Sequence, residues 1–212
     1  AVSGTKGVAA SSNDPGGRES AVSWTDNDGN LWIYGGDGYQ GPGDKNYSGV
    51  LNDLWKYDIS TGYWTWVGGD RGDQENINKI SVPGTKGIAS SSTSPGGRRK
   101  SSAWTHSDGT LWLYGGWGYQ GVNDSQKAGG VLNDIWKYDI STGLWTWVDG
   151  EVGNANNLDL IAVSGTKGVA ASSNDPGGRR EEASWTDKDG NFWIYGGYGY
   201  QGINANQKAL GF

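Results

Sequence analysis

Short runs of alternating side chains recur along this chain, and each run ends in a turn-forming sequence. Leu31–Tyr34 (LWIY) and Trp64–Trp66 (WTW) alternate with a period of two, as expected for pleated, mostly buried strands. No stretch of 10 residues shows the period of an amphipathic helix. The pattern therefore predicts an all-β fold.

The first 80 residues contain four such runs. The first two are joined by Asp26–Gly29 and the last two by Ile59–Gly62, both short turns in which glycine supplies a positive φ. Short strands separated by tight turns form antiparallel hairpins. The four predicted strands are residues 19–25, 30–35, 51–58 and 62–67.

The whole chain is built from one repeated unit, about 80 residues long. Trp24 recurs as Trp104 and Trp185, and residues 1–18 are identical to residues 162–179. Four antiparallel strands cannot bury both faces of their sheet alone, so such units come in series. The predicted units are residues 1–80, 81–161 and 162–212, the third with its first two strands only.

The unit resembles a kelch repeat. The resemblance is carried by Gly16-Gly17-Arg18, the double glycine that ends Leu31–Gly36, the Tyr-Asp that ends Leu51–Asp58, and the tryptophans of Trp64–Trp66. It implies a β-propeller of four-stranded antiparallel blades, of which this chain supplies about two and a half. The unit is longer than the usual kelch length of roughly 50 residues.

A propeller is a closed ring, and two and a half blades would leave bare apolar faces and unpaired strand edges. We therefore expect either that the sequence is a segment of a larger propeller or that copies of it complete one another by self-association. We favour the first.

The extra length of the unit lies in two loops, residues 37–50 and 68–98, which a blade of alternating strands places on the same face. Long loops on a rigid scaffold often bind ligands. Here an aromatic ring could stack on a sugar while glutamine contacts hydroxyls; alternatively, these side chains lock the loop onto its own blade. The candidate residues are Tyr39, Gln40, Trp117, Tyr119, Gln120, Tyr200 and Gln201.

An arginine opens the first strand of every unit: Arg18, Arg98 and Arg179. The kelch resemblance implies that this strand is innermost and that the arginine lies near the channel mouth, where its planar fork suits a carboxylate ligand. The competing interpretation is a structural salt bridge or a backbone contact to the next blade.

No catalytic or metal site is predicted. With 1 His and 0 Cys, the chain lacks the usual nucleophiles and the ligands of the copper site of galactose oxidase, whose kelch architecture it resembles. Asp26–Asn30 superficially resembles a calcium loop, but no glutamate follows to complete the ligand set, and a hairpin turn explains the sequence. Calcium is thus a weak alternative to no cofactor.

The formal net charge is -6 and the pI about 4.7, which argues against nucleic acid as a partner. No apolar run is long enough to span a membrane. We predict an extracellular, bacterial, non-enzymatic module that binds a carbohydrate or protein ligand. The alternatives are a structural building block of an extracellular filament or matrix, and a non-catalytic segment of a larger secreted enzyme.

Overall fold

The prediction of an all-β chain is confirmed. The computed structural model describes residues 4–40, 47–70, 77–201 and 209–211, which form antiparallel strands joined by turns. The helical content of these residues is two short 3-10 turns, Asp124–Gln126 and Ala155–Asn157.

Each unit forms a large sheet from the strands that the alternation predicted, in the order first, second, third, fourth. The first sheet has the order β2-β3-β6-β7 and the second β9-β10-β13-β14, while the third has two described strands, β16 and β17. The strands are β2 (Val22–Thr25), β3 (Leu31–Tyr34), β6 (Leu54–Asp58), β7 (Tyr63–Gly68), β9 (Ser102–Thr105), β10 (Leu111–Tyr114), β13 (Ile135–Asp139), β14 (Leu144–Asp149), β16 (Ala183–Thr186) and β17 (Phe192–Tyr195).

Residues 37–50 are not a plain loop, and on this point the prediction was wrong. They contain a hairpin that pairs with a short strand at the start of the unit, so each unit adds a small three-stranded sheet. The hairpin is rich in glycine and lacks the alternation that marks the large sheets. The small sheets contain β1 (Arg18–Glu19), β4 (Asp37–Gln40) and β5 (Tyr47–Val50); β8 (Arg98–Arg99), β11 (Trp117–Gly121) and β12 (Lys127–Val131); and β15 (Arg179–Arg180), β18 (Tyr198–Gln201) and β19 (Ala209–Gly211).

The predicted strand 19–25 is likewise divided, into β1 and β2. Ser20 lies between them with φ 56°, a left-handed conformation that ends one extended segment before the next begins. The first piece joins the small sheet and the second joins the large one.

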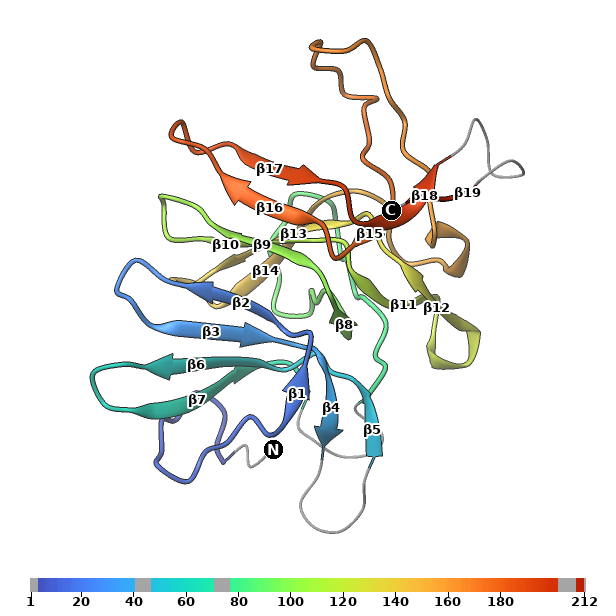
Figure 1. The fold of residues 1–212 in the computed structure, drawn as a ribbon. Helices are drawn as coiled ribbons and strands as arrows, with labels where there is room; N and C mark the ends of the chain where they lie inside the picture. The colour runs from blue at the N-terminus through green and yellow to red at the C-terminus, as the bar shows by residue number, and fades with distance from the viewer. Residues whose placement is uncertain (1–3, 41–46, 71–76, 202–208, 212) are drawn as a thin grey trace.

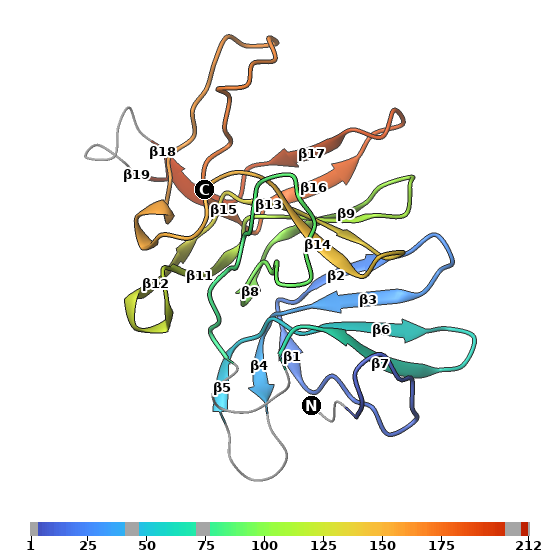
Figure 2. The same cartoon turned by 180° about the vertical axis from the view of Figure 1, so that it is seen from behind.

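The large sheets lie side by side like the leaves of a fan, with the small sheets at the opposite side of the molecule (Figures 1 and 2). The first strands are neighbours: β2 lies beside β9, and β9 beside β16. The tight turns of the large sheets all project at one end (Figure 1).

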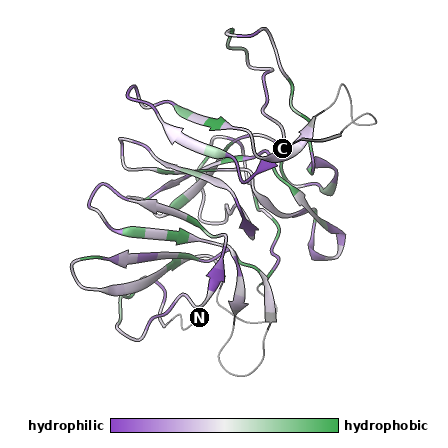
Figure 3. Cartoon of the chain, viewed as in Figure 1, coloured by the Kyte–Doolittle hydropathy of each residue, from purple (hydrophilic) through white to green (hydrophobic). Residues whose placement is uncertain are grey.

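The core lies between the first and second large sheets. Trp32 and Tyr34 of β3 pack against Tyr138 and Trp145 of the second unit, with ring centroids 5.9 Å (Trp32–Tyr138) and 5.3 Å (Tyr34–Trp145) apart. All four side chains are buried. Hydropathy colouring shows apolar segments on β3 and, at the far end of the fan, on β17 (Figure 3).

The double glycine after the second strand brings successive units together. Gly36 has φ 94° and its N–H donates to the carbonyl of Arg98 at 2.9 Å. A Cβ atom on Gly35 would lie 2.5 Å from the same carbonyl oxygen. A side chain at Gly35 would therefore separate the units.

Candidate functional site

Two of the three repeated arginines, Arg18 and Arg98, form an ion pair within their own unit. The Arg98 guanidinium forms two parallel bonds to Asp134, Nη1–Oδ1 and Nη2–Oδ2, both 2.8 Å. It also donates to the carbonyls of Gly115 and Pro95, and neither charged side chain is exposed to solvent. Arg18 binds Asp53 in the same way, at 2.7 and 2.8 Å.

Each of these aspartates also accepts a bond from a tryptophan two residues further on. Trp136 Nε1 donates to Asp134 at 2.6 Å, and Trp55 Nε1 donates to Asp53 at 2.7 Å. The structure thus favours the structural interpretation for Arg18 and Arg98. Arg179 contacts the carbonyls of Pro176 and Gly196, and no carboxylate partner for it lies among the described residues.

The candidate aromatic residues lie in strands of the small sheets. Trp117 packs edge-on against Tyr119, with ring centroids 5.2 Å apart, and the Arg99 guanidinium lies 4.8 Å from the Trp117 ring centroid. Lys127 Nζ lies 5.5 Å from the Tyr119 ring centroid. These contacts favour the alternative in which the aromatic side chains lock the hairpin, whereas Tyr39, at 57% exposure, is available to solvent.

Among the candidate glutamines, the structure describes the side chain of Gln120. Gln120 is fully buried and its Nε2 donates to the carbonyl of Glu151 at 3.0 Å, so it joins the hairpin to the following connection. Tyr200 is half-buried and pairs with Ile161 through a parallel bridge. The side chains of Gln40 and Gln201 lie outside the described part of the structure.

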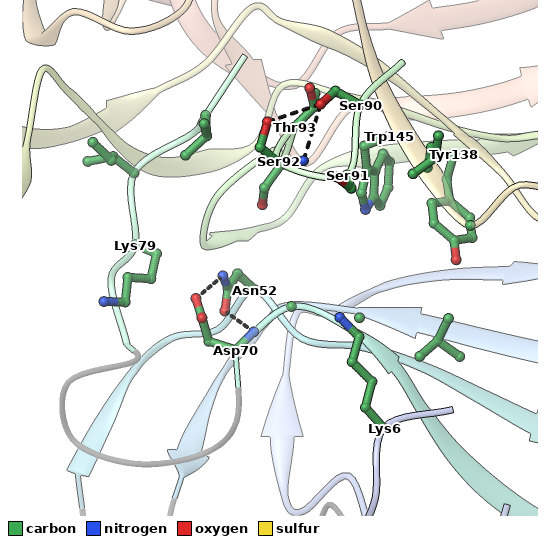
Figure 4. Close-up of a pocket in the computed structure, with 18 of the residues that line it drawn as sticks. Lys6, Asn52, Asp70, Lys79, Ser90, Ser91, Ser92, Thr93, Tyr138 and Trp145 are labelled. Atoms are coloured by element: carbon green, nitrogen blue, oxygen red, sulfur yellow. Dashed lines mark hydrogen bonds between the residues drawn. The ribbon is translucent and has the colours of Figure 1, made fainter. Parts of the chain in front are cut away.

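A cavity of about 740 Å³ opens between the first and second units. It runs between the outer strands β7 and β14, and residues from both kinds of predicted long loop line it (Figure 4). Lys79 and Ser90–Ser94 come from the connection 68–98, and Asn123 and Asp124 from the β11–β12 connection.

The lining combines polar and apolar side chains in similar measure. Asn52 Nδ2 donates to Asp70 Oδ2 at 2.7 Å, and this pair lies across the cavity from Ser90–Thr93 (Figure 4). Lys79 and Lys6 lie at the two ends of the labelled cluster (Figure 4). Ammonium, amide, hydroxyl and carboxylate groups together can bind a polyhydroxylated ligand from several directions.

This cavity was missed because the residues that distinguish it do not repeat. Lys79 occupies the position that Leu160 occupies at the next junction, and Ser94 corresponds to Asp175. At the second junction Asp175 accepts a bond from Asn133 at 3.0 Å, whereas at the first junction the counterpart of Asn133, Asn52, donates to Asp70 instead. The signal for this cavity in the sequence was therefore the set of positions at which one unit differs from the next.

The calcium-like segment is a hairpin turn. Asp26 accepts bonds from Asn30 and from Trp32 Nε1, the latter at 2.8 Å. Burial acts to raise the pKa of Asp26, but the bonds from Trp32, Asn30 and Asp28 outweigh it and lower the pKa. Among the residues that the structure describes, no group of three or more His, Asp or Glu side chains is arranged to hold a metal ion.

Comparison with known proteins gives no family. No family model and no curated protein matches the chain. Among solved structures, the chain is similar to one described as "Structure of YjhT", with 18% identity and a TM-score of 0.47. The match covers 87% of this chain and 36% of the other, so this chain spans about a third of that protein. Within the described ranges, no helix is long and apolar enough to cross a membrane.

Proposed function

We propose that this chain is part of an extracellular kelch-type β-propeller that binds a carbohydrate on its long-loop face without catalysing a reaction. A protein ligand at the same face is the alternative. The order of strands within each large sheet and the adjacency of β2, β9 and β16 support the architecture, because first strands meet around the axis of a propeller.

The observation that carries the ligand proposal is the cavity between the first two units. Its lining combines two lysines with amide, hydroxyl and carboxylate groups, which match the alternating donors and acceptors of a sugar. The position of Lys79 is apolar at the second junction, so fold maintenance does not require a lysine there.

The surroundings of the two adjacent glutamates support the proposal of binding without catalysis. The adjacent carboxylates Glu181 and Glu182 have opposite surroundings: Glu181 is exposed and pairs with Lys100, whereas Glu182 is half-buried and both of its carboxylate oxygens are shielded from solvent. They cannot act on one bond as the paired carboxylates of a glycosidase do.

The test is a glycan array probed with the 212-residue chain, followed by titration calorimetry on the best glycan. We expect Lys79→Ala to weaken binding about tenfold, the loss of one charge-assisted hydrogen bond, and Lys6→Ala to weaken it similarly. Unchanged binding in both variants, or no binding to any glycan by the folded chain, would exclude a carbohydrate in this cavity.

The repeat offers a matched control. Lys86 occupies in the second unit the position of Lys6 in the first; Lys6 Nζ lies 5.9 Å from the Trp66 ring centroid, and Lys86 Nζ 5.7 Å from that of Trp147. Lys86 does not line this cavity, so Lys86→Ala should leave glycan affinity unchanged while removing the same charge and the same ring contact, together with the Lys86–Asp149 ion pair, which has no counterpart at Lys6 among the described residues.

A further inference from the structure

The two ends of the fan expose complementary halves of one interface. At the far end Trp185, Trp193 and Tyr195 are 46, 49 and 76% exposed. The corresponding side chains of the first unit, Trp24, Trp32 and Tyr34, are 5, 2 and 1% exposed, because the second unit covers them. We call Trp185, Trp193 and Tyr195 the third-unit face.

The opposite half is exposed on the first unit. Leu31 is 42% exposed and Tyr57 and Trp64 are half-buried. Their counterparts in the second unit, Leu111, Tyr138 and Trp145, are 0, 3 and 8% exposed. We call Leu31, Tyr57 and Trp64 the first-unit face; in residue type it is identical to the surface that covers Trp32 and Tyr34.

A tryptophan of the first strand donates a hydrogen bond across each internal junction, but the two acceptors occupy different repeat positions. Trp24 Nε1 donates to the carbonyl of Trp112 at 2.8 Å, and Trp104 Nε1 donates to that of Trp185 at 3.1 Å. At the end of this series Trp185 Nε1 has no acceptor among the described residues. Trp112 corresponds to Trp32 and Trp185 to Trp24, so the two matching acceptors on the first unit are the carbonyls of Trp32 and Trp24.

The tyrosine hydroxyls form a hydrogen bond that occupies the same repeat position at both internal junctions. Tyr34 Oη donates to the carbonyl of Gly96 at 2.7 Å, and Tyr114 Oη donates to that of Gly177 at 2.5 Å. No acceptor for Tyr195 Oη lies in the part of the chain that the structure describes, and Gly16 is the corresponding residue of the first unit.

A backbone hydrogen bond between equivalent residues of successive units also repeats at both junctions. The N–H of Lys100 donates to Ser20 O at 2.9 Å, and the N–H of Glu181 donates to Lys100 O at 3.1 Å. All three residues have φ between 56 and 60°. The next bond of the series would join the N–H of Ser20 to the carbonyl of Glu181, one at each end of the fan.

We propose that the third-unit face of one chain docks onto the first-unit face of a second copy, head to tail, and reproduces the junction already present twice within the chain. A second copy is the occupant because it carries the required side chains and acceptors in the required order. Such a contact is heterologous, so it forms a ring if the rotation closes and a filament if it does not. The inference depends on the internal junctions and not on the ligand.

The experiment measures the mass of the 212-residue chain by sedimentation velocity over a range of concentrations. We expect association that increases with concentration. Tyr195→Arg damages one face and Leu31→Arg the other, and each should weaken self-association roughly 100-fold by placing a charge in an aromatic interface. Both positions are solvent-exposed in the single chain, so near-ultraviolet circular dichroism should show unchanged folds.

Mixing the two variants gives the decisive result. Each retains the face that the other has lost, so an equimolar mixture should form dimers and nothing larger. A monomer at every concentration, association that survives both substitutions, or a mixture that stays monomeric would overturn the proposal.

Val8→Arg is the control for added charge. Val8 and its counterparts Ile88 and Val169 are 51, 59 and 56% exposed, so neither internal junction covers this position. The variant should associate as the unaltered chain does, while glycan binding in the cavity is measured separately and can fail without affecting this outcome.

Discussion

Arg98 and Asp134 form an ion pair that is completely removed from solvent, with two parallel bonds of 2.8 Å joining the start of β8 to the segment just before β13. The pair links two segments of the second unit that lie 36 positions apart in the chain. The same pair recurs between Arg18 and Asp53.

We predict that Arg98→Ala lowers the free energy of unfolding by about 3–5 kcal/mol, because it leaves the Asp134 carboxylate buried without its counter-charge. Urea unfolding followed by tryptophan fluorescence measures the change. The matched control is Arg179→Ala: Arg179 occupies the same repeat position but has no carboxylate partner among the described residues, and its removal should cost far less. Equal losses in both variants would show that the ion pair is not what matters.

The tyrosine hydroxyls at the junctions give a second prediction. Tyr34→Phe removes the bond to the Gly96 carbonyl inside a buried interface, so it should lower the free energy of unfolding by about 1–2 kcal/mol. Tyr195→Phe should change the stability of the single chain by less than about 0.5 kcal/mol, since its side chain is 76% exposed. Urea unfolding at low protein concentration separates the two; a costly Tyr195→Phe there would contradict the assignment.

Close approach of the units predicts a steric effect at Gly35. An alanine Cβ at Gly35 would lie 2.5 Å from the Arg98 carbonyl oxygen and 2.8 Å from that of Leu51, and both neighbours are backbone. Gly29 also has a positive φ, 84°, but an added Cβ there meets nothing within 4 Å. Gly29→Ala should therefore cost only the conformational strain, roughly 1–2 kcal/mol, and Gly35→Ala substantially more. Thermal unfolding of the two variants measures the difference, and equal costs would mean that the units can move apart freely.

The sequence predicted the large sheets well and the binding surface poorly. Trp32, Trp55 and their repeats mark strands because large aromatic side chains alternate there, and hydrophobic alternation is a local signal. The hairpin that contains Tyr39 gives no such signal, because glycine and polar residues pair through backbone bonds alone.

The candidate site could not be predicted for a different reason. Arg98 and Gln120 are polar residues that recur, and recurrence does not distinguish a ligand contact from a buried structural bond; only the partner Asp134 and the carbonyl of Glu151 decide that. Lys79 reaches the cavity through the packing of two units, which no spacing within one unit encodes. Its difference from Leu160 was visible in the sequence, but its location was not.

The two adjacent glutamates at the second junction predict opposite responses to pH. Burial raises the pKa of Glu182 above its ordinary value of 4.5, and this effect outweighs its hydrogen bonds and the charge of Arg179. A carboxyl whose pKa is raised by folding adds stability at low pH, and that stability is lost as the pH rises through the folded-state pKa. Glu182→Gln keeps the neutral form at every pH, so relative to the unaltered chain it should be more stable at pH 7, on the order of 1 kcal/mol, and equal below pH 4.

Glu181 is the control, because the Lys100 ammonium lies 2.5 Å from its carboxylate and holds its pKa below the ordinary value. That contribution is present above the unfolded-state pKa and is lost as the pH falls through the folded-state pKa, so Glu181→Gln should be the less stable protein at pH 7 and equal to the unaltered chain in acid. Urea unfolding of both variants between pH 3 and 7 gives two difference curves of opposite sign. Curves of the same sign would mean that the net charge of the surface, rather than the burial of Glu182 between the second and third units, controls the response to pH.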